Sequence, residues 1–441
     1  MKIAACLVTL IMFTGNILCA GGGSGEKDFQ RLIRKHHHPL ENAKSLDPLI
    51  HLASDKKVVL LGEATHGTSE FYAWRDSISR RLISEHGFSF ILVEGDWASL
   101  FMLNRYVKGF SPHSSAKEVV KQFDRWPPWM WRNEEVAALA EWLREYNSGL
   151  EPDKRVGFYG MDVYDEWNSY DEVMAFLADY DTALHSDISG FYYCMKMFGR
   201  DGWQYAGAIS RGYHACAPKL RQAFEHLEEK LAADEELMPY DVLYVMQNAR
   251  VFKNAEKFFR KAVTDRSASW NSRVQHMFAT LQNLLGFHGP DAKAIVWAHN
   301  THIGDARFTD MHLQAQVNSG QLAREHFGAE NVLLTGFGTY TGQTLAGRQW
   351  GQAMLELTLP PAVSGSFEAR LHHSMPGDFF LVMNPQLRQH PYIGEQSGHR
   401  AAGVVYNPEH EHMGNYVPSI PGSRYDVFIF FEKTSALRFV H

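Results

Sequence analysis

The chain has 441 residues, 45% hydrophobic and 21% charged, which is a globular composition with enough length for one large core or two smaller ones. Its net charge is −7 and it contains no long basic run, so its composition argues against nucleic acid as a partner. The four cysteines form no Cys-x-x-Cys pattern, which removes the usual sequence sign of a zinc site.

The first predicted element is a secretory signal. Lys2 provides a short positive region, and the apolar stretch 3–18 is too short and too interrupted by polar residues to span a membrane well. A small residue and a glycine run follow it. We therefore expect a secreted or periplasmic protein with no membrane span after cleavage, divided into a signal peptide (1–20), a flexible linker (21–30) and a folded domain (31–441).

Cysteine usage leaves two questions open. Cys19 at the end of the signal makes a lipoprotein the alternative to soluble export. The folded domain keeps Cys194 and Cys216, which could pair in an oxidising compartment or remain two separate buried thiols.

Short apolar runs, each followed by polar residues, predict buried strands. They are apolar at every position instead of alternating, which is typical of strands covered on both faces. Helical patterns lie between them, as from Ser69, where Thr68 or Ser69 can cap the start and Gly87 can end the helix, and over Glu134–Tyr146. This alternation predicts an α/β fold with a mostly parallel central sheet flanked by helices. The predicted strands are 58–61, 90–93, 156–159, 294–298, 332–335, 379–383 and 427–431.

The segment from about 167 to 285 has a different pattern. It is rich in Ala, Leu, Glu and Lys at helical spacing and has no strand signal. We predict a large helical insertion between two strands. Such an insertion can act as a lid over the strand ends, or it can pack on the sheet edge.

Carboxylates and imidazoles follow the ends of four predicted strands. If the strands are parallel, these groups meet at one carboxyl edge, where open α/β sheets bind ligands. A cation on the next helix lies close enough in sequence to point back at that edge. The set comprises Glu63 and His66 after the first strand, Glu94 after the second, Asp162 after the third, His299 and His302 after the fourth, and Arg75 as the cation.

Two chemistries suit these residues, and the spacing does not separate them. In one, His66 removes a proton from water, Glu63 orients the imidazole, and an oxyanion is stabilised. His299, His302 or Arg75 would supply that stabilisation. In the other, a divalent metal activates the water. Its candidate ligands are His66, Glu94, His299 and His302.

Two further patterns bear on the site. No Gly-x-Ser-x-Gly motif is present, so a serine nucleophile elbow has no support in the sequence. The rigid aromatic segment Trp126–Arg132 could line an apolar substrate cleft, or it could only close a loop over the core.

The segment Leu61–Phe71 closely resembles the signature of the erythromycin esterase family, and so does Trp297–Arg307. Weaker similarity extends the resemblance over nearly all of the chain after the signal. It involves the segments 131–135, 157–162, 270–273, 336–340 and 425–434.

The resemblance implies an α/β core with a helical insertion, and an enzyme that hydrolyses a macrolide lactone ester without a serine nucleophile. It also implies that His66 activates water and that the matching Glu63, Arg75, Glu94, His299 and His302 are essential or line the site. We expect an exported carboxylic-ester hydrolase acting on a small-molecule ester or macrolide, as macrolide-resistance enzymes of the family do, with no required cofactor. The alternatives are a metal-dependent hydrolase of another ester or amide, and a non-catalytic ligand-binding relative.

Overall fold

The computed structural model describes residues 22–441. The predicted signal peptide (1–20) and Cys19 lie outside the described residues. Along 22–441, no helix combines the length and apolar composition that crossing a bilayer requires.

Helix α1 (Gly22–His36) corrects the prediction of a flexible linker over 21–30, since residues 22–30 are helical. Phe29 and Ile33, one turn apart, are both buried. The Phe29 ring packs against the rings of His390 and Tyr392, with centroids 4.9 and 5.2 Å away. Burial of these apolar side chains holds the helix against the C-terminal part of the chain. The sequence did not predict this helix because the residues around Phe29 and Ile33 are mostly polar.

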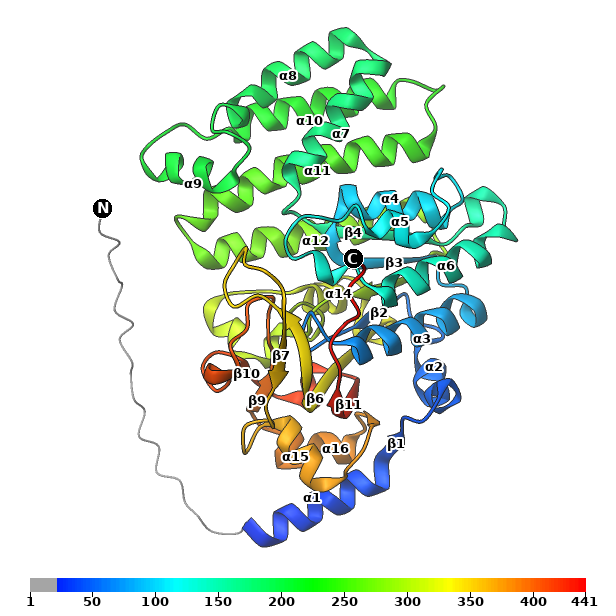
Figure 1. Ribbon diagram of the computed structural model, residues 1–441, viewed down its shortest axis with the longest axis vertical. Coiled ribbons are helices and arrows are strands. Elements are labelled where there is room, and N and C mark those ends of the chain that lie inside the picture. The colour runs from blue at the N-terminus through cyan, green and yellow to red at the C-terminus, as the bar shows by residue number, and fades with distance from the viewer. Residues whose placement is uncertain (1–21) are drawn as a thin grey trace.

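The centre of the molecule is a nine-stranded sheet with the order β1-β8-β11-β6-β2-β5-β3-β4, and β7 pairs with β6 (Figure 1). The pairings from β11 to β4 are parallel, whereas β1, β8 and β7 pair antiparallel. A separate two-stranded sheet pairs β9 with β10. The strands are β1 (His37–Pro39), β2 (Val58–Leu61), β3 (Phe90–Asp96), β4 (Gly157–Asp162), β5 (Ala294–Trp297), β6 (Val332–Ala346), β7 (Leu355–Leu359), β8 (Phe379–Val382), β9 (Ser397–Arg400), β10 (Tyr416–Ser419) and β11 (Val427–Thr434).

The mixed α/β fold with a mostly parallel sheet is therefore confirmed, and each predicted strand is present. Its strands bury side chains on both faces, as their continuous apolar runs indicated. Val59 and Leu61 enter one core, and Val58 and Leu60 enter the other.

Helices cover both faces of the sheet. One core packs α2 (Asp47–Ala53), α3 (Ser69–His86), α5 (Ala116–Val120) and α6 (Glu134–Ser148) on the sheet, and α4 (Trp97–Val107) contributes to both cores. Helix α3 ends at Gly87, as predicted, because that residue adopts φ 69°, a left-handed conformation that glycine adopts without strain. The remaining helices outside the insertion are α13 (Asn300–Ile303), α14 (Ser319–Phe327), α15 (Phe367–Ser374), α16 (Pro385–Gln389), α17 (Pro391–Gly394) and α18 (Pro421–Arg424).

The segment between β4 and β5 is helical, as predicted, and forms the upper part of the molecule in Figure 1. Most of it packs around a hydrophobic core of its own, while α12 also packs on the sheet. That the insertion moves as a lid stays a prediction. Cys194 and Cys216 lie in this region as free thiols, not as a disulfide. Its helices are α7 (Glu166–Tyr180), α8 (Thr182–Lys196), α9 (Gly202–Ser210), α10 (Ala217–Ala232), α11 (Pro239–Ala262) and α12 (Arg266–His288).

Candidate active site

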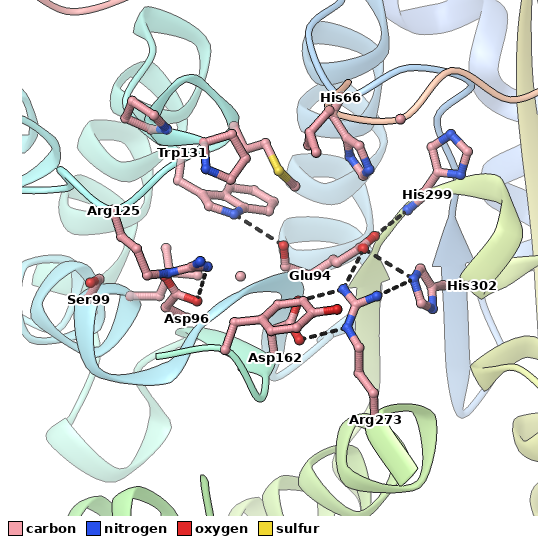
Figure 2. Close-up of a pocket in the computed structure, with 18 of the residues that line it drawn as sticks. His66, Glu94, Asp96, Ser99, Arg125, Trp131, Asp162, Arg273, His299 and His302 are labelled. Carbon is pink, nitrogen blue, oxygen red and sulfur yellow. Dashed lines mark hydrogen bonds and ion pairs between the residues drawn. The ribbon is translucent and has the colours of Figure 1, made fainter. Parts of the chain in front are cut away.

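A pocket of about 320 Å³ opens where the carboxyl ends of β2, β3, β4 and β5 meet. Of the seven residues grouped from the sequence, five line it, namely His66, Glu94, Asp162, His299 and His302 (Figure 2). The other two, Glu63 and Arg75, lie behind His66 and reach the pocket through it. Parallel pairing of the four strands brings these groups together.

Three side chains, Arg75, Glu63 and His66, form a chain of hydrogen bonds beside the pocket. Arg75 donates from NH2 to Glu63 Oε2 at 2.8 Å, and the other carboxylate oxygen lies 2.8 Å from His66 Nδ1. Arg75 and Glu63 are 0% and 1% exposed. The central carbon of the Arg75 guanidinium lies 4.3 Å from the ring centroid of Tyr72 and 4.8 Å from that of Trp297. These contacts fix the carboxylate and, through it, the imidazole.

This arrangement tunes His66 as a base. Burial alone would lower the pKa of His66, but the hydrogen bond and charge of Glu63, with the charge of Glu94, raise it above its ordinary value. With Nδ1 held by the carboxylate, Nε2 is the ring nitrogen free to accept a proton in the pocket.

A buried ion cluster forms the opposite wall, where Arg273 of α12 enters between two carboxylates (Figure 2). Arg273 donates to Asp162 at 2.9 and 2.6 Å and to Glu94 Oε1 at 2.9 Å. Burial opposes ionisation of both acids. However, His302, His66 and Arg273 hold the pKa of Glu94 well below its usual range, and Arg273 lowers the pKa of Asp162. Glu94 is therefore held as an anion, and the other members of the ion cluster balance its charge.

The backbone places Glu94 for this role. Between Val93 and Asp96 the register of β3 against β4 shifts, an irregularity that re-aims side chains at a sheet edge. The second carboxylate oxygen of Glu94 accepts the backbone N–H of His299 at 2.9 Å, which ties the end of β3 to the start of α13.

His299 is a neutral imidazole whose tautomer is set locally. It caps α13, so its Nδ1 accepts the backbone N–H of Thr301 at 3.3 Å and lies 2.9 Å from the Thr301 hydroxyl. Burial, followed by the charge of His66, lowers the pKa of His299 well below its usual value. The ring proton therefore resides on Nε2, which has no partner within residues 22–441. Its ring centroid is 4.9 Å from that of His66.

His302 belongs to the ion cluster of Glu94 and Arg273 and not to the hydrogen-bond chain that ends at His66. Its Nε2 lies 3.1 Å from Glu94 Oε1 and 3.2 Å from Arg273 NH1. Its ring stacks on Trp270 with a centroid separation of 4.7 Å and an interplanar angle of 15°. One aromatic partner and two charged partners thus fix its orientation.

The four candidate metal ligands do not form a metal centre in this geometry. Within residues 22–441, no three His, Cys, Asp or Glu side chains converge as a coordination set. The guanidinium of Arg273 already occupies the cation position beside Glu94 and His302. The donor set therefore fits an arginine-centred ion cluster better than a divalent ion.

Arg273 and Trp270 were not among the site residues proposed from the sequence. They lie in the helical insertion, and only the family resemblance of 270–273 drew attention to them. In the segment Trp126–Arg132, Pro127 and Trp131 line the pocket, while Trp129 is buried in the core. The segment therefore both lines the cleft and covers the core.

A sequence profile of the erythromycin esterase family matches residues 83–434. The chain belongs to the erythromycin esterase family. It is 28% identical over 146 residues to "Erythromycin esterase type II" of Escherichia coli, a match that spans 33% of each chain. It is 22% identical over 386 residues, 83% of each chain, to "Putative hydrolase YbfO" of Bacillus subtilis (strain 168).

Solved structures share the fold of this erythromycin esterase family member. A succinoglycan biosynthesis protein superposes with a TM-score of 0.77 at 20% identity, covering 95% of this chain and 100% of its own. A mutant of the erythromycin esterase EreC in its open conformation superposes with a TM-score of 0.64 at 14% identity, covering 90% and 95%. Family membership supports an esterase or hydrolase, whereas these structural matches establish the fold alone.

Proposed function

We propose that this protein hydrolyses carboxylic esters with a water molecule activated by His66. The observation that carries the proposal is the chain of hydrogen bonds from Arg75 through Glu63 to His66 at the wall of the pocket. A carboxylate on Nδ1 stabilises the imidazolium that forms when the other ring nitrogen takes a proton. Arg75 pairs with that carboxylate and fixes its orientation, and both side chains are buried.

The reaction follows from these positions. His66 Nε2 accepts a proton from water as the water oxygen bonds to the ester carbonyl carbon. The carbonyl oxygen becomes an oxyanion, and we assign its stabilisation to His299, whose ring centroid lies 4.9 Å from that of His66 and whose buried Nε2–H has to turn into the pocket to donate. When the carbon–alkoxide bond breaks, the imidazolium of His66 returns its proton to the leaving oxygen. The products are one carboxylic acid and one alcohol, and His66 is neutral again.

Water is the nucleophile because no protein hydroxyl is placed for attack. Ser99 and Thr301 line the pocket. In the described part of the chain, neither hydroxyl hydrogen-bonds to His66, and the Thr301 hydroxyl contacts His299 instead. An activated serine would need its hydroxyl within reach of the base.

Replacing His66 tests the proposal. His66→Gln keeps a polar side chain but removes the base, so kcat/KM for an activated ester should fall about 10²- to 10⁴-fold. The matched control is His51→Gln, at an exposed position on α2 that should keep full activity. Circular dichroism would verify that both variants fold, and undiminished hydrolysis by His66→Gln would refute the role of His66.

The substrate and the location are parts of the same proposal. The relative from Escherichia coli supports a macrolide lactone as the first substrate to test, and ring opening would add the mass of one water. The sequence of residues 1–20 supports export, with the chain acting outside the cytoplasm on a small-molecule ester. Mass spectrometry of the protein recovered from its native compartment would show whether residues 1–20 are removed.

A further inference from the structure

Asn300 connects the two segments that carry the proposed catalytic residues. Its backbone N–H donates to the carbonyl oxygen of Glu63 at 2.9 Å, and Asn300 itself opens α13 directly after His299. Its side-chain amide pairs with both backbone groups of Phe337 on β6. Nδ2 donates to the carbonyl oxygen at 2.6 Å, and Oδ1 accepts the N–H at 3.2 Å. Asn300 is 0% exposed, and the pocket is lined by its neighbours His299 and Thr301 instead of by Asn300 itself.

The end of β2 leaves room for this side chain. Asn300 follows β5, and β2 lies between β5 and β6 in the sheet, so the amide has to pass the end of β2 to reach Phe337. A Cβ atom at Gly62 would lie 2.1 Å from Oδ1 of Asn300, closer than two non-bonded atoms can approach. Glycine at this position therefore permits the contact. Gly62 directly precedes Glu63, in the segment that leads to His66.

A second buried histidine–carboxylate pair contacts Asn300. Nδ1 of His399 on β9 lies 2.5 Å from Oε1 of Glu368 on α15, and both residues are 0% exposed. Nε2 of His399 lies 3.3 Å from Nδ2 of Asn300 and 3.1 Å from the hydroxyl oxygen of Tyr425. The mechanism proposed above uses none of these side chains.

The contact with Phe337 sets the direction of these hydrogen bonds. Because Oδ1 of Asn300 accepts the N–H of Phe337, Nδ2 faces His399 as a donor. Nε2 of His399 therefore accepts, and the ring proton resides on Nδ1, where the carboxylate of Glu368 accepts it. Burial lowers the pKa of His399, which keeps the ring in this neutral form. Each contact from Glu368 through His399 to Asn300 thus joins one donor to one acceptor.

The segment after β9 makes a second connection to the site. Ala402 donates its backbone N–H to the carbonyl oxygen of Ala64 at 2.8 Å, in the loop that leads to His66. Ala401 and Gly403, on either side of it, line the pocket. The strand that carries His399 is therefore attached to the His66 loop directly and to the His299 segment through Asn300.

We propose that Glu368 and His399 are positioning residues for ester hydrolysis, acting through Asn300 on the relative placement of His66 and His299. The inference rests on the proposed function for the reaction that these residues serve. His399 holds the amide of Asn300, and the backbone of Asn300 holds Glu63 on one side and continues from His299 on the other. A misplacement of about 1 Å in reacting groups can lower turnover about 10²-fold, so support from behind the pocket wall affects the rate.

Two substitutions of His399 separate its ring nitrogens. Asn places an amide nitrogen near the position of Nδ1 and can donate to Glu368, but it leaves no acceptor near the position of Nε2. Gln places its amide near Nε2 and can accept from Asn300, but it loses Nδ1. With 4-nitrophenyl acetate we expect His399→Asn to lower kcat about tenfold or more with little change in KM, and His399→Gln to retain most of the activity. Equal kcat in the two variants would overturn the proposal.

A second pair of variants applies if His399→Asn does not fold, which circular dichroism would show. Glu368→Gln keeps an oxygen that can accept the Nδ1 proton of His399, whereas Glu368→Ala removes it. We therefore expect Glu368→Gln to retain a higher kcat than Glu368→Ala. Equal kcat in this pair would contradict the positioning role.

His372→Asn is the matched control. His372 lies on α15, as Glu368 does, and its Nδ1 is 2.6 Å from Oε1 of Glu432. Its ring stacks on Tyr340 with a centroid separation of 3.6 Å. This substitution removes a histidine–carboxylate pair whose partners are Glu432 and Tyr340 instead of Asn300, so kcat should stay at the wild-type value. A fall in kcat equal to that of His399→Asn would show a general effect of the substitution and overturn the proposal.

The environment of the His299 ring can be measured without turnover. In protein labelled with ¹⁵N-histidine, comparison with a His299→Gln variant identifies the ring signals of His299. We expect His399→Asn to shift these signals and His372→Asn to leave them in place. Shifted signals in a protein that hydrolyses no ester would reject the esterase and retain the link from His399 to His299. Hydrolysis that depends on His66, with wild-type kcat and unmoved His299 signals in His399→Asn, would reject the positioning role and leave the esterase intact.

Discussion

The Arg75 guanidinium and the Glu63 carboxylate form a fully buried ion pair, 2.8 Å apart, which His66 separates from the pocket. Their burial means that the orientation of His66 depends on a contact that solvent does not screen. Arg75→Lys keeps the charge but loses the contact of a planar guanidinium with the rings of Tyr72 and Trp297. We expect kcat/KM to fall about tenfold or more through misplacement of His66, whereas Arg80→Lys, at a partly exposed pair on the same helix, should change it little. Wild-type kinetics in Arg75→Lys would show that Glu63 needs no anchor.

The pH profile should report the tuning of His66. Because Glu63 raises its pKa above 6.5, the acid limb of kcat/KM should lie above pH 6.5, with activity rising as His66 loses its proton. Glu63→Gln removes the charge, so the limb should move to lower pH while the maximal rate falls. If the acid limb of the profile stays at the same pH in Glu63→Gln, the group that titrates is not His66.

The same shift affects stability. A folded-state pKa raised above the unfolded value contributes stability that is fully present below about pH 6.5 and is lost as pH rises through the folded value. The difference in free energy of unfolding between wild type and His66→Gln should therefore be larger at low pH than at high pH. Urea denaturation at several pH values measures it, and a difference that grows with pH would contradict the sign.

The ion cluster of Arg273 makes the opposite prediction at acid pH. The lowered pKa values of Glu94 and Asp162 contribute stability above their unfolded values, and this is lost as pH falls through the folded values. Arg273→Met leaves the buried carboxylate of Asp162 without its cation and removes one of the partners of Glu94, so near neutral pH we expect a loss of about 3–5 kcal/mol. Wild type and variant should converge in stability only as pH falls below the usual carboxyl range, because the folded-state pKa values of both acids lie below it. If the free energies of unfolding of wild type and Arg273→Met differ by the same amount at every pH, the ion cluster does not make this contribution to stability.

Chelation tests the arginine-centred geometry. Because Arg273 occupies the cation position beside Glu94 and His302, dialysis against a chelator should leave kcat/KM unchanged. Elemental analysis of the active protein before and after dialysis accompanies the assay. Activity that disappears with a bound metal and returns with its addition would restore the metal-dependent alternative.

The sequence predicted the central sheet because its strands are buried on both faces and therefore apolar throughout, as Val58–Leu61 is. It did not reveal β9 (Ser397–Arg400), whose polar residues pair only because tertiary structure brings β10 alongside. Similarly, the strand-end acids and histidines could be grouped by topology, but Arg273 could not. It reaches Asp162 across 111 residues of sequence, from a helix whose other charged residues give no sign of the pocket.

The helical insertion has a further consequence. Helices α7 to α11 pack around a core separate from the two that flank the sheet, whereas α12 carries Arg273 into the catalytic wall. The chain thus divides into a helical part with its own core and a part that carries the proposed catalytic residues. A chimaera that exchanges residues 166–262 between family members should keep the proposed catalytic wall intact, provided that the exchange stops before α12. Helices α7 to α11 can therefore vary among family members while the wall that carries Arg273 stays the same.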